Sequence, residues 1–228
     1  MRLAIIVPTL DEADGIAASL APLQGLRRAG HAVIVVDGGS RDGTPALAAP
    51  LADRVLAAPR GRARQMNAGA AATTAEALLF LHADTRLPVD AAERIAKALA
   101  RHAWGRFDVC IEGRSTLLRV VAALMNLRSR LTGISTGDQA IFVRRSVFDA
   151  VGGFPDQPLM EDIELSKRLK RIGRPACLRA RVVTSGRRWE RHGVWRTILL
   201  MWRLRFDYWR GVPAERLAQR YDPNQSQT

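Results

Sequence analysis

The chain has only two cysteines, Cys110 and Cys177, far apart in its 228 residues and each within a strand-like segment. This pattern favours buried thiols in a reducing compartment over a disulfide or a cysteine metal site. No run of about 18 uncharged apolar residues occurs, so no membrane-spanning helix is predicted. Met1 and Arg2 lead into an apolar run that Pro8 ends, which is too short for a secretory signal. We therefore expect a cytoplasmic protein.

Acidic residues do not balance the basic residues in the second half of the chain. The net charge is +13, and residues 1–112 carry 13 basic and 12 acidic side chains, so nearly all of the excess falls in residues 113–228. Such asymmetry indicates a polyanionic partner, either anionic lipid headgroups, nucleic acid or a phosphorylated substrate. RNA-binding sequence signatures are absent, so we expect no nucleic-acid partner.

Apolar runs of strand length alternate with helical segments in the first half of the chain. The runs cover residues 3–7, 32–36, 54–57 and 78–81. Alternation of this kind predicts an α/β fold with a mostly parallel central sheet flanked by helices.

Carboxylates follow three of these four runs. Asp11 or Glu12 follows the first, Asp37 the second, and Asp84 the fourth, in the stretch LLFLHADTR. Because parallel strands present their carboxyl ends at one edge of a sheet, these acids predict a ligand site there, with Asp84 as the leading ligand for a cation or a substrate hydroxyl. The alternative is that Asp84 only caps a helix opening near Pro88.

Three arginines follow the remaining run. Arg60, Arg62 and Arg64 lie in a glycine-containing loop before a helix, where guanidinium groups and backbone amides together suit phosphate. A solvated helix face is the alternative.

Two segments in the second half of the chain are candidates for a functional role. The run MEDIEL predicts a helix whose first turns carry Glu161 and Asp162, either as simple helix-dipole partners or with one acid as a general base. Residues 194–209 interleave aromatic and arginine side chains at helical spacing, which is typical of a helix in a membrane interface. The alternative there is a helix packed on the domain with its arginines solvated.

The order and spacing of six blocks resemble the family-2 inverting glycosyltransferases with the GT-A fold: IIVPTLDE, VVDGGSRDGT, RGRARQMNAGA, LLFLHADT, GDQAIFVRR and MEDIELSKRLKRIGR. The chain looks closest to a small bacterial subgroup known as selenodomain-associated transferases. The resemblance implies the GT-A, or nucleotide-diphospho-sugar transferase, fold over residues 1–192, with a nucleotide-sugar-binding half (1–112) and an acceptor-binding half (113–192). A basic amphipathic helix and tail would follow over 193–228.

The resemblance also implies roles for residues of the donor side. The base and ribose would be held by Pro8, Thr9, Leu10, Glu12 and Asp37, and the diphosphate would lie near Arg60, Arg62, Arg64 and Asn67. Asp84 would match the last aspartate of the family's Asp-any-Asp motif and bind Mn²⁺ or Mg²⁺. His82 replaces the first aspartate, and would either ligate the metal or face the nucleotide.

On the acceptor side, the pair Glu161-Asp162 matches the family's Glu-Asp motif, in which the aspartate deprotonates the acceptor hydroxyl. The acceptor site would be lined by Gly137, Asp138, Gln139, Arg188 and Trp189. Processive synthases carry Gln-any-any-Arg-Trp, but here Ser185 replaces the glutamine, so we expect transfer of a single sugar, with inversion, from a nucleotide-diphosphate sugar.

Two other functions, a nucleotidyltransferase and a non-catalytic scaffold, agree less well with the sequence. A nucleotidyltransferase would need a glycine-rich phosphate loop after the first strand, and PTLDE has no glycine. A non-catalytic basic scaffold on an anionic membrane accounts for the charge but leaves the acids at the strand ends unexplained. The helix over 194–209 favours an acceptor hydroxyl on a lipid and peripheral contact with the inner face of the membrane over a freely soluble acceptor.

Overall fold

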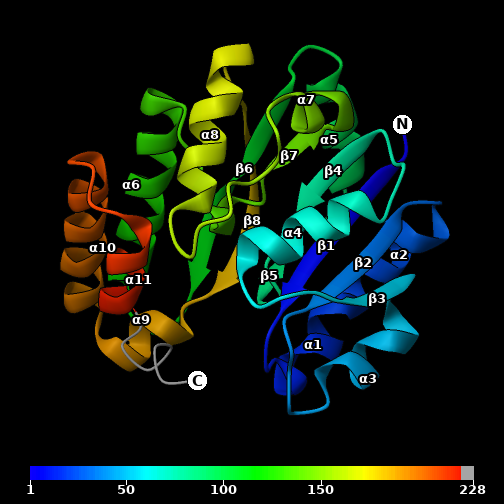
Figure 1. Ribbon diagram of the computed structural model, residues 1–228, viewed down its shortest axis with the longest axis horizontal. Helices are drawn as coiled ribbons and strands as arrows, with labels where there is room; N and C mark the ends of the chain where they lie inside the picture. Colours follow the sequence, from blue (N-terminus) through cyan, green and yellow to red (C-terminus); the bar gives the residue numbers. More distant parts are fainter. Residues whose placement is uncertain (222–228) are drawn as a thin grey trace.

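The computed structural model describes residues 1–221, except for the side chains of Arg188 and His192. Its described part contains one eight-stranded sheet with the strand order β3-β2-β1-β4-β7-β6-β8-β5 (Figure 1). The strands are β1 Leu3–Thr9, β2 Ala32–Asp37, β3 Arg54–Ala57, β4 Ala77–Phe80, β5 Thr85–Arg86, β6 Trp104–Glu112, β7 Phe142–Arg144 and β8 Ala176–Ser185.

Helices lie along both faces of this sheet and at its β6–β8 end (Figure 1). The α-helices are α1 Ala13–Leu20, α2 Gln24–Arg28, α3 Thr44–Ala48, α4 Arg62–Ala71, α5 Ala91–Leu99, α6 Leu117–Thr132, α7 Arg145–Ala150, α8 Glu161–Ile172, α9 Arg187–His192, α10 Val194–Trp209 and α11 Ala214–Tyr221. Short 3₁₀ turns are η1 Ala21–Leu23, η2 Ala49–Leu51 and η3 Gly137–Gln139.

The sheet is mostly parallel, as the alternation of strands and helices predicted. Strands β1 to β4 run in one direction, and β6 and β8 run parallel to each other. Only β7, between β4 and β6, and the two-residue β5 pair antiparallel with their neighbours. The α/β GT-A architecture expected from the sequence is therefore confirmed.

The first strand extends two residues beyond its predicted end at Val7. Pro8 and Thr9 still pair with Val36 and Asp37 of β2. Ile6 faces β4, because its carbonyl accepts from the Leu81 amide. The backbone N–H and C=O groups of successive residues point to alternate sides of a strand, so those of residue 8 point to the β4 side, as those of Ile6 do. β4 has already ended there, at Phe80. The missing amide hydrogen of Pro8 therefore leaves no ladder bond unmade.

Both faces of the sheet are buried by alternate residues of the same strands. In β1, Leu3, Ile5 and Val7 belong to one apolar cluster, which contains residues of α1, α5 and α6. Ala4 and Ile6 belong to a second cluster, which contains residues of α4, α7 and α8. The continuous apolar runs in the sequence follow from this burial on both sides.

The C-terminal helices pack on the rest of the molecule. The predicted helix over 194–209 is α10, and a further helix, α11, was not predicted. A third cluster joins Leu204 of α10 and Leu217 of α11 to Leu159 and Met160, which directly precede α8. None of the helices described over residues 1–221 is long and apolar enough to cross a membrane. The tail after Tyr221, which belongs to the predicted unit 193–228, lies outside the described residues.

The two cysteines are free, as expected, but only half-buried. Cys110 lies on β6 opposite Val183, and Cys177 lies on β8 opposite Arg106, so the strand register keeps the thiols apart.

We expect Gly69→Ala to destabilise the protein. Gly69 lies where α4 crosses β1 and β2, and a Cβ there would come 2.5 Å from Ile6 Cγ2 and 3.0 Å from Val36 Cγ2. Overpacking of this kind costs about 1–3 kcal/mol. Urea unfolding would measure the loss in free energy of unfolding.

Gly15→Ala in α1 is the matched control, because its Cβ would meet nothing within 4 Å. This change should stabilise the protein by roughly 0.5–1 kcal/mol. Equal effects of the two substitutions would contradict the close packing of α4 on the sheet.

Candidate functional site

Polar groups gather at the edge of the sheet where the parallel strands end. β1 ends at Thr9 and β2 at Asp37, while His82 and Asp84 follow β4. Because β7 is antiparallel, its amino end brings η3 to the same edge, and the first turn of α8 supplies Glu161 and Asp162. The predicted donor and acceptor segments therefore meet at one rim.

Asp37 organises the turn that follows β2. One of its carboxylate oxygens accepts from the amides of Gly39 and Ser40, both at 2.9 Å. The other accepts from the hydroxyls of Ser40 and Thr9. Asp37 is 95% shielded from solvent, being 5% exposed, so it shapes the rim with most of its hydrogen-bonding capacity already used.

The loop after β1 is tied to the loop after β2. The amide of Asp11 donates to Ser40 Oγ at 2.9 Å, and Glu12 donates to Thr44 Oγ1 at 2.9 Å. Asp11 itself adopts a left-handed backbone with φ 52°. These contacts fix the position of Leu10 and Glu12 on the rim, next to the buried Pro8 and Thr9 of β1.

The predicted phosphate loop is largely helical, because α4 begins at Arg62. Arg64 turns away to pair with Asp156 at 2.7 Å. The Asn67 amide bonds both backbone groups of Phe154, at 2.9 and 3.0 Å. These two side chains are therefore not directed at the strand edge, and Arg60 is exposed.

Gln65 of α4 is a site residue that was not singled out from the sequence. Its side chain is buried and donates to the carbonyls of Thr9 and Val36, both at 2.8 Å. It thereby locks α4 onto the ends of β1 and β2. Its position in the RGRARQMNAGA block is the feature of the sequence from which Gln65 could have been predicted as a site residue.

Arg62 is the arginine of α4 that faces the acids. Desolvation lowers the pKa of its guanidinium, but Tyr221, Glu161, Asp138 and Asp162 together outweigh this effect and raise the pKa of Arg62 above its usual value. A permanent cation from α4 thus stands beside the acids of η3 and α8.

Asp84 lies with Glu12 and Arg187 on the other side of the rim. Asp84 accepts from the hydroxyls of Thr85 at 3.2 Å and Thr184 at 3.4 Å. Burial raises the pKa of Glu12, with a contribution from Asp84 and against the opposing charge of Arg187, which lies 3.5 Å from Glu12. Its neighbour Arg188 was predicted from the sequence as a site residue, whereas Arg187 was missed.

The capping alternative for Asp84 is wrong. The helix after Pro88 begins at Ala91, and Asp90 occupies its N-cap position. Asp84 is left free for a ligand at the rim.

His82, Gly137 and Asp138 form one contact group. His82 Nδ1 lies 3.4 Å from Asp138 Oδ1. A Cβ on Gly137 would collide with the His82 ring, so only glycine allows this approach. Desolvation opposes ionisation of Asp138, but His82, Arg62 and Arg128 hold the pKa of its carboxyl below the usual value.

The acid pair at the start of α8 is held in a defined geometry. Asp162 accepts from the amide of Gly137 at 2.8 Å with one oxygen and from the amide of Ile163 at 2.7 Å with the other. Desolvation raises the pKa of Asp162 against these two amides. Desolvation, followed by the charge of Asp162, raises the pKa of Glu161 to about 7. Both acids line a small cavity with His82 and Gly137.

The other predicted acceptor residues serve mainly as supports. Gln139 is fully buried and bonds the Thr136 amide at 3.2 Å and Asn126 Oδ1 at 3.3 Å. Trp189 packs against the main apolar cluster from α9. The side chain of Arg188 lies outside the described part of the structure.

The donor set at the rim suits a cation that is completed by substrate oxygens. Within residues 1–221, no three His, Cys, Asp or Glu side chains cluster closely enough to form a protein-only metal site. Mg²⁺-like cations are commonly held by one or two carboxylates and substrate phosphates. Asp84, with few bonds to its own oxygens, fits that arrangement.

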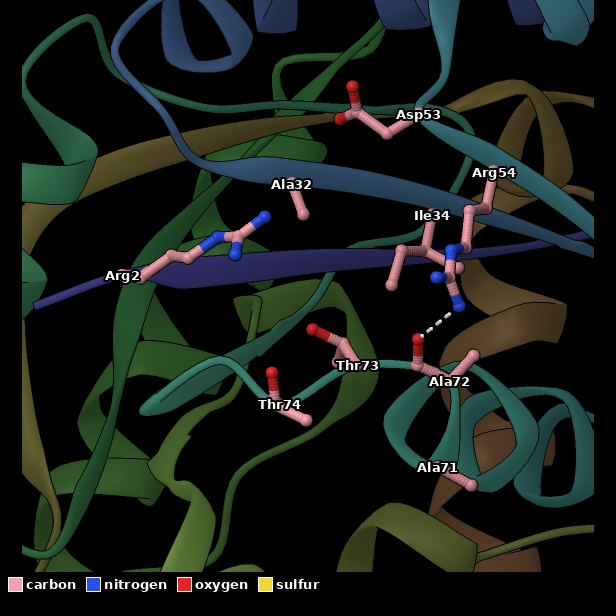
Figure 2. Close-up of a pocket in the computed structure, with 9 residues that line it drawn as sticks. All are labelled: Arg2, Ala32, Ile34, Asp53, Arg54, Ala71, Ala72, Thr73 and Thr74. Atoms are coloured by element: carbon pink, nitrogen blue, oxygen red, sulfur yellow. Dashed lines mark hydrogen bonds between the residues drawn. The ribbon is translucent and has the colours of Figure 1, made fainter.

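A separate cavity lies at the opposite end of the strands (Figure 2). It measures about 350 Å³ and is lined by Arg2 and the first residues of β2 and β3. Arg54 donates to the Ala72 carbonyl at 2.7 Å, and Asp53 pairs with Arg27 at 3.1 Å. Its best-placed charges are thus already paired, and it is remote from the acids of the rim.

The sheet order and the rim of acids define a GT-A transferase architecture, and comparison with known proteins agrees. The profile of the family described as Glycosyl transferase family 2 matches residues 4–152. The chain belongs to that family. No curated protein matches the chain significantly.

Solved structures show the same fold. The mannosyltransferase PcManGT from Pyrobaculum calidifontis, in complex with GDP-Man and Mn²⁺, is 26% identical with a TM-score of 0.61, over 80% of this chain and 56% of that one. TarS from S. aureus is 17% identical with a TM-score of 0.60, over 82% of this chain and 61% of that one.

A third solved structure is glucosyl-3-phosphoglycerate synthase from Mycobacterium tuberculosis, in complex with Mn²⁺, UDP and glucosyl-3-phosphoglycerate. It is 18% identical with a TM-score of 0.59, over 80% of this chain and 70% of that one. The chain therefore spans little more than half of the mannosyltransferase and about two thirds of the synthase.

We expect Glu161 to make stability fall as pH rises from about 4.5 to about 7, because its pKa is raised from 4.5 to about 7 in the folded state. In that range the native state holds a proton that the unfolded state has released, so raising the pH favours unfolding. Relative to Glu161→Gln, the wild type should lose on the order of 1–3 kcal/mol between about pH 5 and about pH 8. Urea unfolding at both pH values would measure the difference, and parallel pH profiles for the two proteins would contradict it.

Proposed function

We propose that the protein transfers one sugar from a nucleotide-diphosphate sugar to an acceptor hydroxyl, with inversion at the anomeric carbon. The observation that carries this proposal is the placement of Asp84, Arg62 and Asp162 along one rim of the sheet. The first two suit a departing diphosphate, and the third suits a hydroxyl that must lose a proton.

The reaction follows from these positions. Asp162 accepts the proton of the acceptor hydroxyl, the oxygen attacks the anomeric carbon, and the bond from that carbon to the diphosphate breaks. Attack from the face opposite the leaving group inverts the centre. Gly137 and Ile163 hold the carboxylate through their amides, and each oxygen keeps a lone pair for the hydroxyl.

The leaving diphosphate would be stabilised from the donor half. Asp84 would hold Mn²⁺ or Mg²⁺, with His82 either as a ligand or facing the nucleotide, and the cation would supply charge stabilisation of the diphosphate. Arg62 adds a positive charge that needs no cation. GDP-Man with Mn²⁺ in the similar mannosyltransferase and UDP with Mn²⁺ in the similar synthase support this donor class.

Transfer of a single sugar is part of the same proposal. Ser185 stands at the end of β8, where processive relatives carry glutamine, and its hydroxyl is engaged by Arg187 at 3.2 Å. The side chain at this position therefore supports the adjoining turn.

Asp84→Ala should lower the affinity for the matching nucleoside diphosphate by about tenfold or more in the presence of Mn²⁺, because the cation loses its protein ligand. Calorimetric titration with UDP, GDP, CDP and TDP, each with and without Mn²⁺, would measure it. Asp162→Asn should keep this binding but slow transfer by about 10²–10⁴-fold.

Asp14→Ala, an exposed change on α1, is the control and should bind nucleotide like the wild type. If the folded wild-type protein bound none of the four nucleotides, the proposal would fail, and the non-catalytic basic scaffold would take its place.

We further propose that α10 rests on an anionic membrane surface, at the inner face of the membrane. Side chains at spacings of three and four residues form one exposed apolar stripe on α10: Trp195 65%, Leu199 63%, Trp202 66%, Phe206 54% and Trp209 79% exposed. Arg196 and Arg203 of the same helix and Arg210, which directly follows it, are exposed and complement anionic headgroups. An acceptor hydroxyl on a lipid would then be within reach of the site.

Replacing Trp202 and Trp209 together by serine should weaken binding to phosphatidylglycerol-containing vesicles by roughly tenfold or more, because two exposed aromatic anchors are lost. Vesicle co-sedimentation of the full chain would measure it, and neutral phosphatidylcholine vesicles should bind weakly. Val89→Ser, at a fully exposed apolar position away from α10, is the control. A wild type that ignores both vesicle types, or that buries the stripe in a dimer, would contradict the proposal.

A further inference from the structure

Arg128 of α6 carries a guanidinium group that the mechanism above does not use. Its Nε and Nη2 atoms are buried and have no hydrogen-bond partner among the described residues. Buried N–H groups of a cation that lack hydrogen-bond partners cost free energy, and a native structure that keeps them calls for an explanation.

The neighbouring acids do not fill this role. Arg128 interacts electrostatically with Asp162 and Asp138, so it lies close to the acids of the rim. Yet both oxygens of Asp162 accept backbone amides, and Asp138 Oδ1 is paired with His82. The two acids therefore attract Arg128 electrostatically but accept no hydrogen bond from its Nε or Nη2 atom.

Other arginines of the same region are paired. Asp108 accepts from both the buried Arg106 and Arg130 of α6, and Arg106 Nε also donates to Ser129 Oγ at 3.0 Å. The fold therefore satisfies neighbouring guanidinium groups with protein acceptors, and leaves the two nitrogens of Arg128 open.

The position of Arg128 is fixed by the residue two places before it. Asn126 exchanges two hydrogen bonds with the backbone of Val109, at 2.9 and 3.0 Å, and accepts from Gln139 at 3.3 Å. These bonds tie α6 to β6 and to η3, which carries Gly137 and Asp138. Arg128 thus approaches the acids from the acceptor half, whereas Arg62 approaches them from the donor half on α4.

We propose that Arg128 binds a phosphate ester of the acceptor, presented beside the hydroxyl that Asp162 deprotonates. Two nitrogens of a guanidinium fork match two oxygens of a phosphate. The outer face of α6 bears an exposed apolar stripe, Val120, Leu124, Leu127 and Leu131, so the phosphate can come from a lipid headgroup as well as from a soluble ester. This assignment of the acceptor rests on the proposed function.

The test uses the full chain with its donor site filled by Mn²⁺ and the nucleoside diphosphate that binds. Glycerol 3-phosphate and dihexanoyl phosphatidic acid below its micellar concentration are titrated by calorimetry. The wild type should bind at least one of them, and Arg128→Met should weaken that binding by about tenfold or more. Equal affinity for both ligands would assign a soluble phosphate ester, and tighter binding of the short-chain lipid would assign a headgroup.

Arg119→Met, at an exposed position on the same helix, is the matched control and should bind like the wild type. Equal binding by the wild type and Arg128→Met, or no binding by the wild type, would overturn the proposal. The anion titrations are repeated without nucleotide, so a failure of donor binding, which strikes the proposed function, is seen separately.

Thermal unfolding without ligand gives a second readout. Arg128→Met should unfold at the same or a higher temperature than the wild type, because two buried nitrogens without hydrogen-bond partners are removed with the guanidinium. A clearly lower unfolding temperature would show that Arg128 serves to balance the acids structurally and would overturn its assignment to a ligand.

Discussion

The hydrogen bond from the Gly137 amide to Asp162, at 2.8 Å, joins three parts of the site. Gly137 belongs to η3, at the amino end of β7, and Asp162 belongs to α8. His82, which follows β4, packs so closely against Gly137 that a side chain at position 137 would collide with the His82 ring. The antiparallel insertion of β7 next to β4 makes this meeting possible. A sheet with only parallel strands would place the loop before β7 at its other edge.

The charges around this bond are arranged for a reaction in which negative charge moves. Glu161 is buried with a pKa of about 7, so its proton limits the charge collected beside Asp162. Arg62 from α4 and Arg128 from α6 flank the acids. An oxyanion formed on either side of the acids therefore meets a cation already in position, and little reorganisation is needed.

The strand pattern and the acids at strand ends were readable from the sequence because both follow from burial and chain direction. Asp84 was predicted in that way, Asp162 was predicted from the start of a helix and the resemblance to the family's Glu-Asp motif, and the fold was confirmed. Arg64 was grouped with Arg62 because both lie in one loop of the sequence, and Asn67 was added through the family resemblance. The helix starting at Arg62 sends them toward Asp156 and Phe154 instead.

The burial of Arg128 is a second feature of the site that the sequence does not predict. Arg128 lies inside an amphipathic run, where an arginine normally reads as a solvated face. Only the packing of α6 on β6 and η3 shows that its nitrogens are buried. No local pattern encodes that contact, since Asn126 and Val109 meet across 17 residues and Gln139 lies 13 residues further along.

The C-terminal helices bear on the site through packing. Met160 adopts a left-handed backbone, φ 65°, as it leads into α8, and it is buried with Leu204 of α10 and Leu217 of α11. Tyr208 of α10 also contacts α8, with its hydroxyl 3.5 Å from Glu164. Removing everything after residue 193 would therefore uncover the start of the helix that carries Glu161 and Asp162. The exposed stripe of α10 lies apart from the buried face that packs beside α8, so point substitutions on that stripe test the proposed docking without disturbing α8, which a truncation cannot do.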